Sequence, residues 1–467
     1  MRPGFAVAVV TALGLGGCAT IHNMPLNTPS ADPYGGTVMQ AAVAAEKSRE
    51  RWAATNDGTV IGLSFSGGGT RAAAFSFGVL EELARTPSGK GDLLDKVGMV
   101  SGVSGGAISA AYFGLKGRAA LGDFRERFLT QDVMAELRTT INLVNVGRAL
   151  GGGINTDESL RNWFNKQLFH DATFADLIKR GRPITLINAT DVYSRTPFLF
   201  APPTFAALCS NLADYQVSAA VAASAAVPGA FAPIVIETFP GQCQAPLPPS
   251  LERAAKDASG SPLLQAYARS LERARSGQVK YIKLLDGGLV DNYGLSGMTI
   301  ARAASGTPWG PLLPSDAAQL RRLTFLVVDS GRGPQGNWAQ TVEGPAGEEL
   351  ITAVIDTVID ANTQSSYAAF EITMRQWRDE IVRWRCGLKP AEAAQLRGRS
   401  GPWNCRDLKI TVGRISFSQF DAARAKKLNE VPTSFTLPAG TIDELRQAGS
   451  EGLRMNPTFQ AFLKETR

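Results

Sequence analysis

The sequence predicts an α/β protein with a mostly parallel central sheet that is covered by helices on both faces. Short apolar runs typical of buried strands alternate along the chain with segments of helical spacing. The first two runs, residues 60–66 and 97–101, each end in glycines and are followed by a helical segment, as expected for strands joined by crossover helices. A chain of 467 residues with 44% hydrophobic and 19% charged residues is typical of a folded protein rather than a disordered, fibrous or membrane-spanning one.

The elements follow in order along the chain. We expect strands at residues 60–66, 97–101, 183–189, 279–285, 323–329 and 408–417. We expect helices at residues 37–53, 71–84, 107–115 and 348–384. A capping box at 441–444 is expected to open the last helical region. This pattern divides the chain into a signal peptide (1–17), a tether and N-terminal helix (18–57), a core (58–300) with an insertion at 234–278, and a C-terminal extension (301–467) that completes the sheet.

The first residues have the pattern of an export signal. Arg2 precedes an apolar run at residues 5–15, which is too short to span a bilayer but suits a signal peptide. The following Leu15-Gly16-Gly17-Cys18 resembles the lipobox of bacterial lipoproteins, and this resemblance implies that Cys18 is lipidated. No Asp follows the cysteine, which favours the periplasmic face of the outer membrane. The alternative is ordinary cleavage that releases a soluble periplasmic or secreted protein.

Four further cysteines are candidates for disulfides: Cys209, Cys243, Cys386 and Cys405. An even number in an exported protein favours disulfides over four buried thiols. Of the three connectivities, pairing of nearest neighbours is the simplest. No CxxC motif is present, so a zinc ribbon is not expected.

The count of histidines limits the chemistry. Only His22 and His170 are present. The α/β-hydrolase order requires a histidine after the catalytic acid, and no residue after 170 can be that histidine. A His-rich zinc site is excluded by the same count. We expect His170 to be a surface or helix-capping residue. The net charge of +6 is spread along the chain, which does not support nucleic-acid binding but is compatible with an anionic membrane surface. No metal or cofactor is implied.

The segment Gly102-Val103-Ser104-Gly105-Gly106 is a GxSxG motif between an expected strand and an expected helix. Small flanking residues permit a sharp turn that holds a serine hydroxyl clear of the backbone. The N–H of Gly105, at the start of the helix, could face a developing oxyanion. The alternative is a Gly-rich turn with a purely structural role.

A run of three glycines, Gly67, Gly68 and Gly69, follows the first expected strand. Consecutive glycines let the backbone aim several N–H groups at one anion. Neither the phosphate-binding pattern GxxxxGK[ST] nor a GxGxxG turn fits these residues. We therefore interpret residues 67–69 as a candidate oxyanion hole, with a plain tight turn as the alternative.

The segment that begins at Asp286 reads DGGLVDN and closes an apolar strand. An Asp at the carboxyl end of a strand can reach into a crevice above the sheet, although Asp-Gly is also a common turn signal. Asp291 is a rival carboxylate in the same segment. Because no suitably placed imidazole is available, a carboxylate must take the proton of Ser104 if that serine is a nucleophile.

Together these motifs resemble the patatin-like phospholipases, which use a Ser–Asp dyad without histidine. The sequences SGGGTR, GVSGG and DGG occur in the family's order, and residues 188–191 and 223–231 resemble two further family segments. The resemblance covers residues 58–300 and implies a three-layer α/β/α fold. It implies Ser104 as nucleophile, Asp286 as base, the N–H groups of residues 67–69 as oxyanion donors, and Arg71 as a candidate supporting residue. Ala72 stands where the family usually has Gly.

The resemblance implies a serine acyl hydrolase, similar to phospholipase A or lysophospholipase, that cleaves fatty-acyl esters of membrane lipids. The expected partner is therefore an acyl-ester lipid, with no nucleic acid and no cofactor. One alternative is a lipid transacylase, in which an alcohol replaces water as the acceptor. A second is a non-catalytic lipid-binding envelope protein that keeps the fold without turnover.

Overall fold

The computed structural model describes residues 24–36, 57–137, 157–257, 260–333 and 338–466, with a few isolated residues besides. The expected signal peptide, Cys18 and all but three residues of the helix expected at 37–53 lie outside the described residues. Within the described segments, every helix is too short or too polar to span a bilayer.

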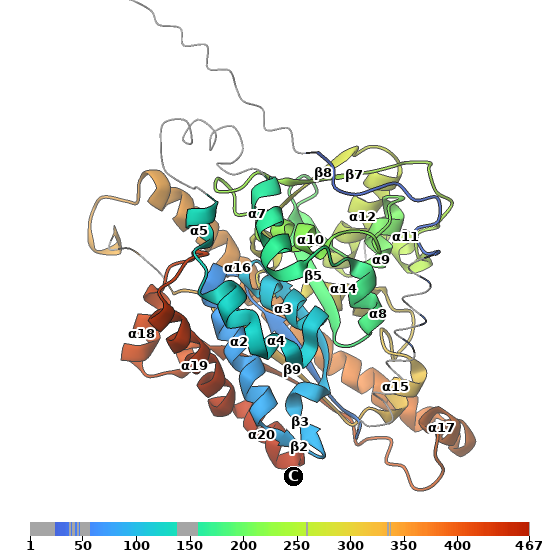
Figure 1. Ribbon diagram of the computed structural model, residues 1–467. Helices are drawn as coiled ribbons and strands as arrows, with labels where there is room; N and C mark the ends of the chain where they lie inside the picture. Colours follow the sequence, from blue (N-terminus) through green and yellow to red (C-terminus); the bar gives the residue numbers. More distant parts are fainter. Residues whose placement is uncertain are drawn as a thin grey trace, which may run out of the picture.

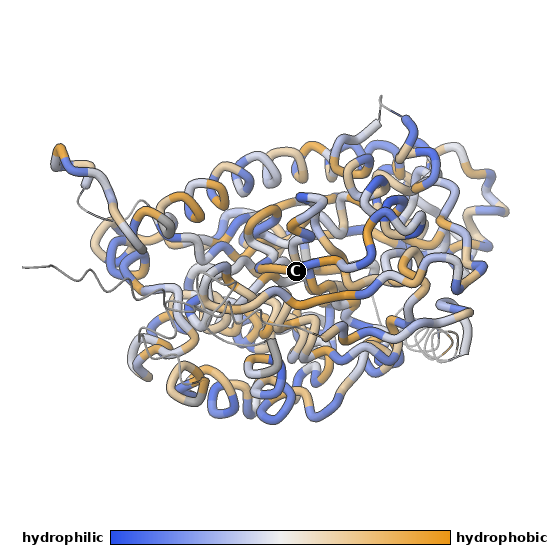
Figure 2. The backbone as a smooth tube through the Cα atoms, turned by 90° about the horizontal axis from the view of Figure 1, so that it is seen from above, coloured by the Kyte–Doolittle hydropathy of each residue, from blue (hydrophilic) through white to orange (hydrophobic). Residues whose placement is uncertain are grey.

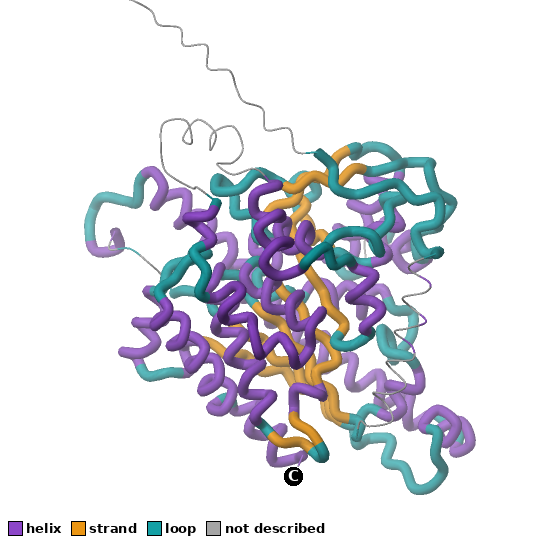
Figure 3. The backbone as a smooth tube through the Cα atoms, viewed as in Figure 1, coloured by secondary structure: helices purple, strands orange, loops and turns teal. Residues whose placement is uncertain are grey.

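A mixed sheet forms the middle of the molecule (Figure 3). Its strands are β1 (Thr59–Phe65), β4 (Val97–Val103), β5 (Ile184–Asp191), β6 (Thr196–Leu199), β7 (Ile234–Glu237), β8 (Tyr281–Leu285), β9 (Arg322–Asp329) and β10 (Lys409–Ser416). The order across the sheet is β10-β9-β1-β4-β5-β8-β7, with β6 also paired to β5. The five strands from β10 to β5 are parallel, whereas β6, β7 and β8 join by antiparallel pairing. A separate short hairpin pairs β2 (Pro87–Ser88) with β3 (Gly91–Asp92).

Helices surround this sheet (Figure 1). Those before the end of β8 are α2 (Gly69–Arg85), α3 (Gly105–Lys116), α4 (Ala120–Phe124), α5 (Val133–Glu136), α7 (Asp157–Phe164), α8 (Phe174–Arg180), α9 (Pro202–Ala207), α10 (Val217–Ser224), α11 (Pro249–Lys256) and α12 (Pro262–Arg275). Those after it are α13 (Gly288–Asp291), α14 (Ser296–Ala304), α15 (Pro314–Gln319), α16 (Gly347–Gly387), α17 (Pro390–Arg397), α18 (Ala422–Glu430), α19 (Ala439–Met455) and α20 (Pro457–Thr466).

Strand β9 shows how the sheet separates two cores. Alternate side chains of a strand point to opposite faces. Leu326 and Val328 pack in the larger core together with α2, α3, α10 and α19. Phe325 and Val327 pack in a second core with α14 and α16. Both faces of the sheet are therefore covered, which confirms the three-layer α/β/α fold. Figure 2, which is coloured by residue hydropathy, shows hydrophobic residues along the segments in the middle of the molecule.

Most expected elements are confirmed. The six expected strands form β1, β4, β5, β8, β9 and β10, with ends shifted by at most two residues. The expected capping box at 441–444 is wrong, because α19 already begins at Ala439 and the N–H of Thr441 donates to the carbonyl of Pro438. The segment expected as an insertion begins with β7, an edge strand that pairs with β8, before α11 and α12 leave the sheet.

Two disulfides join neighbouring cysteines along the chain. Cys209 pairs with Cys243, and Cys386 pairs with Cys405. The first links the end of α9 to the loop that follows β7, and the second links the end of α16 to the loop before β10. This is the nearest-neighbour connectivity.

Candidate active site

Ser104 lies on a sharp turn between β4 and α3. Its backbone has φ 52° and ψ −125°, a conformation that a residue with a side chain rarely adopts. Such a residue costs about 1–3 kcal/mol and persists only where the surrounding structure enforces it. The turn directs the serine out of the strand at the carboxyl end of the parallel sheet, where active sites of α/β proteins lie.

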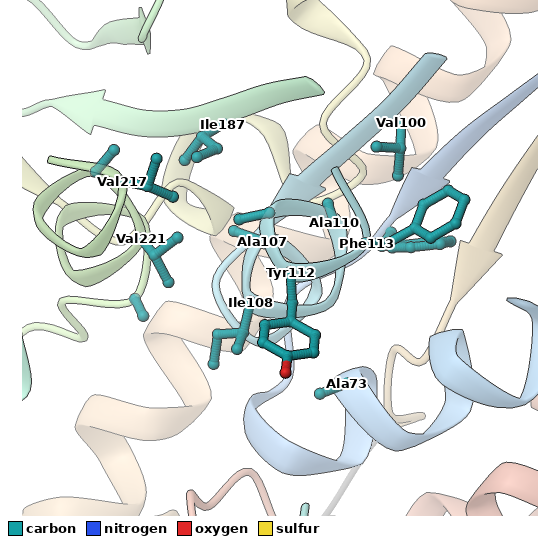
Figure 4. Close-up of a cluster of buried hydrophobic side chains, with 14 of the residues drawn as sticks. Ala73, Val100, Ala107, Ile108, Ala110, Tyr112, Phe113, Ile187, Val217 and Val221 are labelled. Atoms are coloured by element: carbon teal, nitrogen blue, oxygen red, sulfur yellow. The ribbon is translucent and has the colours of Figure 1, made fainter. Parts of the chain in front are cut away.

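Packing of α3 enforces this turn. The helix is buried along its first three turns, and its side chains contact α2, β4, β5 and α10 (Figure 4). The labelled members of this cluster are Ala73, Val100, Ala107, Ile108, Ala110, Tyr112, Phe113, Ile187, Val217 and Val221. A well-packed helix fixes the position of the residue at its N-terminus, so Ser104 is held on a rigid support.

Asp286 faces Ser104 although β8 is antiparallel to β5. The two strands overlap only at their ends, where Thr190 and Asp191 pair with Leu285 and Leu284. Strand β8 therefore arrives from the opposite direction but stops at the carboxyl end of β5. This brings Asp286 to the same edge of the sheet as Ser104.

The hydroxyl of Ser104 donates a hydrogen bond to the carboxylate of Asp286. The N–H of Gly288 donates a second hydrogen bond, of 2.8 Å, to Oδ1 of the same carboxylate. Burial raises the pKa of Asp286 to about 6, and the two hydrogen bonds oppose this rise because they favour the ionised form. At neutral pH the site therefore holds an ionised, desolvated carboxylate bonded to a serine hydroxyl.

The three-glycine turn packs directly on the start of α3. A Cβ atom at Gly105 would lie 1.9 Å from the carbonyl oxygen of Gly69, so only glycine permits this approach. Gly68 has φ 135°, which also favours glycine. The N–H groups of Gly68, Gly69 and Gly105 donate to no other described residue. Three unpaired donors thus lie around the turn that carries Ser104.

The N–H of Gly67 does not have the role that we expected, that of an oxyanion donor. Its N–H donates to both the backbone oxygen and Oδ1 of Asn292, each at 3.1 Å. An amide engaged in this way is not available to an oxyanion. Gly67 instead ties the glycine turn to the segment that carries Asp286.

The sequence did not indicate that Ser224, at the end of α10, is part of the candidate site. Its hydroxyl accepts the N–H of Ser104 at 2.9 Å and donates to the carbonyl oxygen of Asn188 at 2.6 Å. Its own carbonyl accepts the N–H of Gly287, and the carbonyl of Ala226 accepts the N–H of Asp286. One short segment therefore positions the serine and the aspartate. The only sequence signal was its place inside the 223–231 motif.

The rival carboxylate, Asp291, has another role. It is buried, and its two oxygens accept the N–H groups of Leu295 and Ser296 at the start of α14. Asp291 therefore caps a helix, and its bonds hold the loop that follows the segment with Asp286.

Arg71 is buried beside the glycine turn. Its Nε donates to the carbonyl of Ser330 at 3.0 Å, and one terminal nitrogen donates to the carbonyl of Val431 at 2.8 Å. Burial, with the neighbouring charge of Arg332, lowers the pKa of Arg71 to about 9. These two hydrogen bonds tie α2, which carries Arg71, to the loop after β9 and to the C-terminal part of the chain.

Histidine and metal ligands are absent from the described part of the site. His170 is exposed, ends the helical turn Asn165–Phe169 and lies 3.4 Å from a nitrogen of Arg127. His22 lies outside the described residues. Among the residues that the structure describes, no group of three or more His, Cys, Asp or Glu side chains is arranged to hold a metal ion.

No curated protein sequence matches the chain. Three solved structures of human GIVD cytosolic phospholipase A2 resemble it with TM-scores of 0.38–0.39 and identities of 12–14%. They cover 92–96% of this chain, and the chain spans 63–68% of theirs. Two of those structures contain methyl γ-linolenyl fluorophosphonate, one of them with terbium chloride as well. The family model of the patatin-like phospholipases matches residues 63–298, about half of the chain. This range contains the glycine turn, the GxSxG motif and the segment that begins at Asp286. The chain therefore belongs to the patatin-like phospholipase family, which supports a lipid acyl hydrolase activity.

Proposed function

We propose that the protein is a serine hydrolase that cleaves fatty-acyl esters of membrane lipids, with Ser104 as nucleophile and Asp286 as base. The observation that carries this proposal is the hydrogen bond from the Ser104 hydroxyl to the buried Asp286 carboxylate. Membership of the patatin-like phospholipase family supports the lipid ester as the substrate class.

Asp286 takes the proton of Ser104 as the serine oxygen attacks the ester carbonyl. A carboxylate with an ordinary pKa near 4 is a weak base, and burial brings that of Asp286 to about 6. The carboxylate is then still ionised at neutral pH and is a better proton acceptor. The serine hydroxyl is already in position for this transfer.

The attack places negative charge on the former carbonyl oxygen. The free N–H groups of Gly68, Gly69 and Gly105 are the donors available to stabilise it. The positive end of the α3 dipole acts in the same direction. Loss of one such donor typically lowers the rate by about 10²–10³.

Collapse of the tetrahedral intermediate breaks the bond to the alcohol portion of the lipid. Protonated Asp286 returns its proton to that leaving oxygen, and an acyl-enzyme remains on Ser104. Asp286 then takes a proton from water, which attacks the acyl-enzyme. The bond between the acyl group and Ser104 breaks, the fatty acid is released, and Asp286 returns its proton to the oxygen of Ser104. An alcohol in place of water would give the transacylase outcome.

We further propose that the protein is anchored through lipid on Cys18 at the periplasmic face of the outer membrane. The lipobox-like sequence LGGC supports this location. Metabolic labelling with a palmitate analogue tests it, with Cys18→Ala as the control. Incorporation of the label that persists in Cys18→Ala, or no incorporation in the wild type, would contradict lipidation of Cys18. Either result would favour the soluble periplasmic protein instead.

Fluorophosphonate labelling of the purified mature protein, in the presence of lipid vesicles, tests the dyad. We expect labelling to disappear in Ser104→Ala and to fall strongly in Asp286→Ala. Ser109→Ala is the matched control, because the hydroxyl of this buried serine of α3 bonds, within the described part of the chain, only to the carbonyl of Ala73. Circular dichroism checks the folding of each variant. A folded wild type that is not labelled would contradict the proposal and favour the non-catalytic lipid-binding protein.

A further inference from the structure

A second polar site lies at the opposite end of the sheet from Ser104. A cavity of about 210 Å³ opens between α15, α17 and the loop that precedes β10. The charged and aromatic side chains of its lining are Arg321, Arg385, Arg397, Arg399, Trp403 and Asp407. Figure 1 shows α15 and α17 at one end of the molecule and α5 and α7 at the other.

The cavity has an excess of positive charge. Four guanidinium groups line it with a single carboxylate, that of Asp407. Arg385 and Arg321 both pair with this carboxylate. Because one negative charge offsets only one of four positive charges, a net charge of about +3 remains within the lining.

Arg397 is the clearest unmatched group. Its exposed fraction is 9%, and its only hydrogen bond to a described residue runs to the carbonyl of Arg399 at 3.3 Å. The Nε atoms of Arg397 and of the fully buried Arg385 have no hydrogen-bond partner among the described residues. A buried guanidinium without a carboxylate is unfavourable, because desolvation and like-charge repulsion both act against it. An anion in the cavity would relieve both.

The walls of the cavity are held in place. Trp403 lies under two of the guanidiniums, with its ring centroid 5.0 Å from Cζ of Arg385 and 5.4 Å from Cζ of Arg397. The Cys386–Cys405 disulfide joins the residue after Arg385 to the loop that carries Trp403. A rigid arrangement of donors lowers the entropic cost of binding an anion.

We propose that this cavity binds the phosphate group of a soluble compound. Planar guanidiniums match the oxygens of a phosphate group in a bidentate geometry, and several arginines together suit a doubly charged anion. The volume exceeds the share of several liquid waters, about 30 Å³ each, and so accommodates a phosphate group.

The position of the cavity favours a soluble phosphate over a lipid head group. Arg321 immediately precedes β9, whereas Ser104 follows the carboxyl end of β4 in the same parallel array. Eight strand residues at about 3.3 Å each separate the two ends by roughly 25 Å. The dyad must face the lipid during hydrolysis, so the arginine cavity lies on the side away from that lipid.

Calorimetry and thermal melting with inorganic phosphate test the proposal, with chloride at equal ionic strength as the reference. We expect phosphate to bind to the wild type and raise its melting temperature by mass action. Arg397→Gln should weaken binding about 10- to 100-fold, the usual effect of losing a charge-assisted hydrogen bond. Arg406→Gln is the matched control, because it removes the same charge from the loop before β10 at a residue that does not line the cavity. It should bind phosphate as the wild type does.

Melting without phosphate separates binding from a structural role. Arg397→Gln should melt at the same temperature as the wild type or higher, because it relieves repulsion. Lower melting with and without phosphate would overturn the proposal, as would equal phosphate binding by the Arg397→Gln and Arg406→Gln variants. If Arg397→Gln does not fold, the exposed Arg399 provides a second variant, Arg399→Gln, with the same expected loss of binding.

Vesicle sedimentation distinguishes the two sources of phosphate. We expect phosphatidylglycerol and phosphatidylcholine vesicles to bind Arg397→Gln and Arg406→Gln equally. Weaker binding of Arg397→Gln alone to phosphatidylglycerol vesicles would assign the cavity to a lipid head group and overturn the soluble ligand.

Discussion

Replacing Asp286 with asparagine should inactivate the enzyme and stabilise its fold at the same time. The carboxylate is buried next to the hydroxyl of Ser104. In the proposed mechanism its charge accepts the proton of Ser104, but the same charge is unfavourable for folding. Asparagine has nearly the same shape and can still accept the N–H of Gly288 through its side-chain oxygen. The substitution therefore removes the charge while it preserves most of the packing.

The size of the effect follows from the pKa. Burial raises the pKa of Asp286 from 3.8 to about 6, and each pKa unit corresponds to about 1.4 kcal/mol. The folded protein holds the proton of Asp286 more tightly than the unfolded chain does. Protonation of Asp286 therefore stabilises the fold, and this contribution to the unfolding free energy is fully present below pH 3.8 and is lost as the pH rises through about 6. At pH 8 the ionised Asp286 should cost about 3 kcal/mol of unfolding free energy, and at pH 5 about half of that.

Urea denaturation followed by circular dichroism, at pH 5 and pH 8, measures this difference. We expect Asp286→Asn to exceed the wild type in unfolding free energy at both pH values, with the larger margin at pH 8. Fluorophosphonate labelling of the same samples should be lost. A variant that is no more stable than the wild type at pH 8, or a margin that does not change with pH, would refute the reasoning about the buried charge.

Three further predictions concern the same site. Ser224→Ala should slow labelling and lower the unfolding free energy by about 1–3 kcal/mol, because it leaves the buried N–H of Ser104 without an acceptor. Ser218→Ala in the same helix should cost little, since that buried hydroxyl has no hydrogen-bond partner among the described residues. Gly105→Ala should abolish labelling through its clash with the glycine turn, whereas Gly122→Ala, which meets open space in α4, should be tolerated. The labelling rate of the wild type should fall about tenfold per pH unit below pH 6, because the base must be ionised; a flat profile would argue against a carboxylate base.

The location of the candidate site was predicted from local patterns. Periodic apolar runs identified β1 and β4, and glycines at their ends marked where each strand turns into a helix. Because these strands are parallel, both turns lie at one edge of the sheet, and Ser104 lies beside the glycine turn. The scarcity of histidine restricted the choice of base to a carboxylate. These inferences need only neighbours along the chain and the direction of the strands.

The roles of individual groups depended on distant partners. Asp286 and Asp291 are the same residue type in the same segment, so the sequence does not distinguish their roles. Only the structure shows that Asp286 bonds to Ser104 and that Asp291 caps α14. Likewise, three adjacent glycines look equivalent until Asn292, 225 residues away, occupies the N–H of Gly67.

The sequence by itself determined the fold class, the strands of the parallel sheet and the order of the motifs, because period and turn chemistry are properties of contiguous residues. Only the tertiary structure decided which N–H groups beside Ser104 have no acceptor among the described residues. It also decided that arginines from before β9, from α16 and from α17 meet in one cavity. Hydrogen-bond satisfaction and charge balance are sums over contacts between distant segments, and the local pattern of a sequence does not record them.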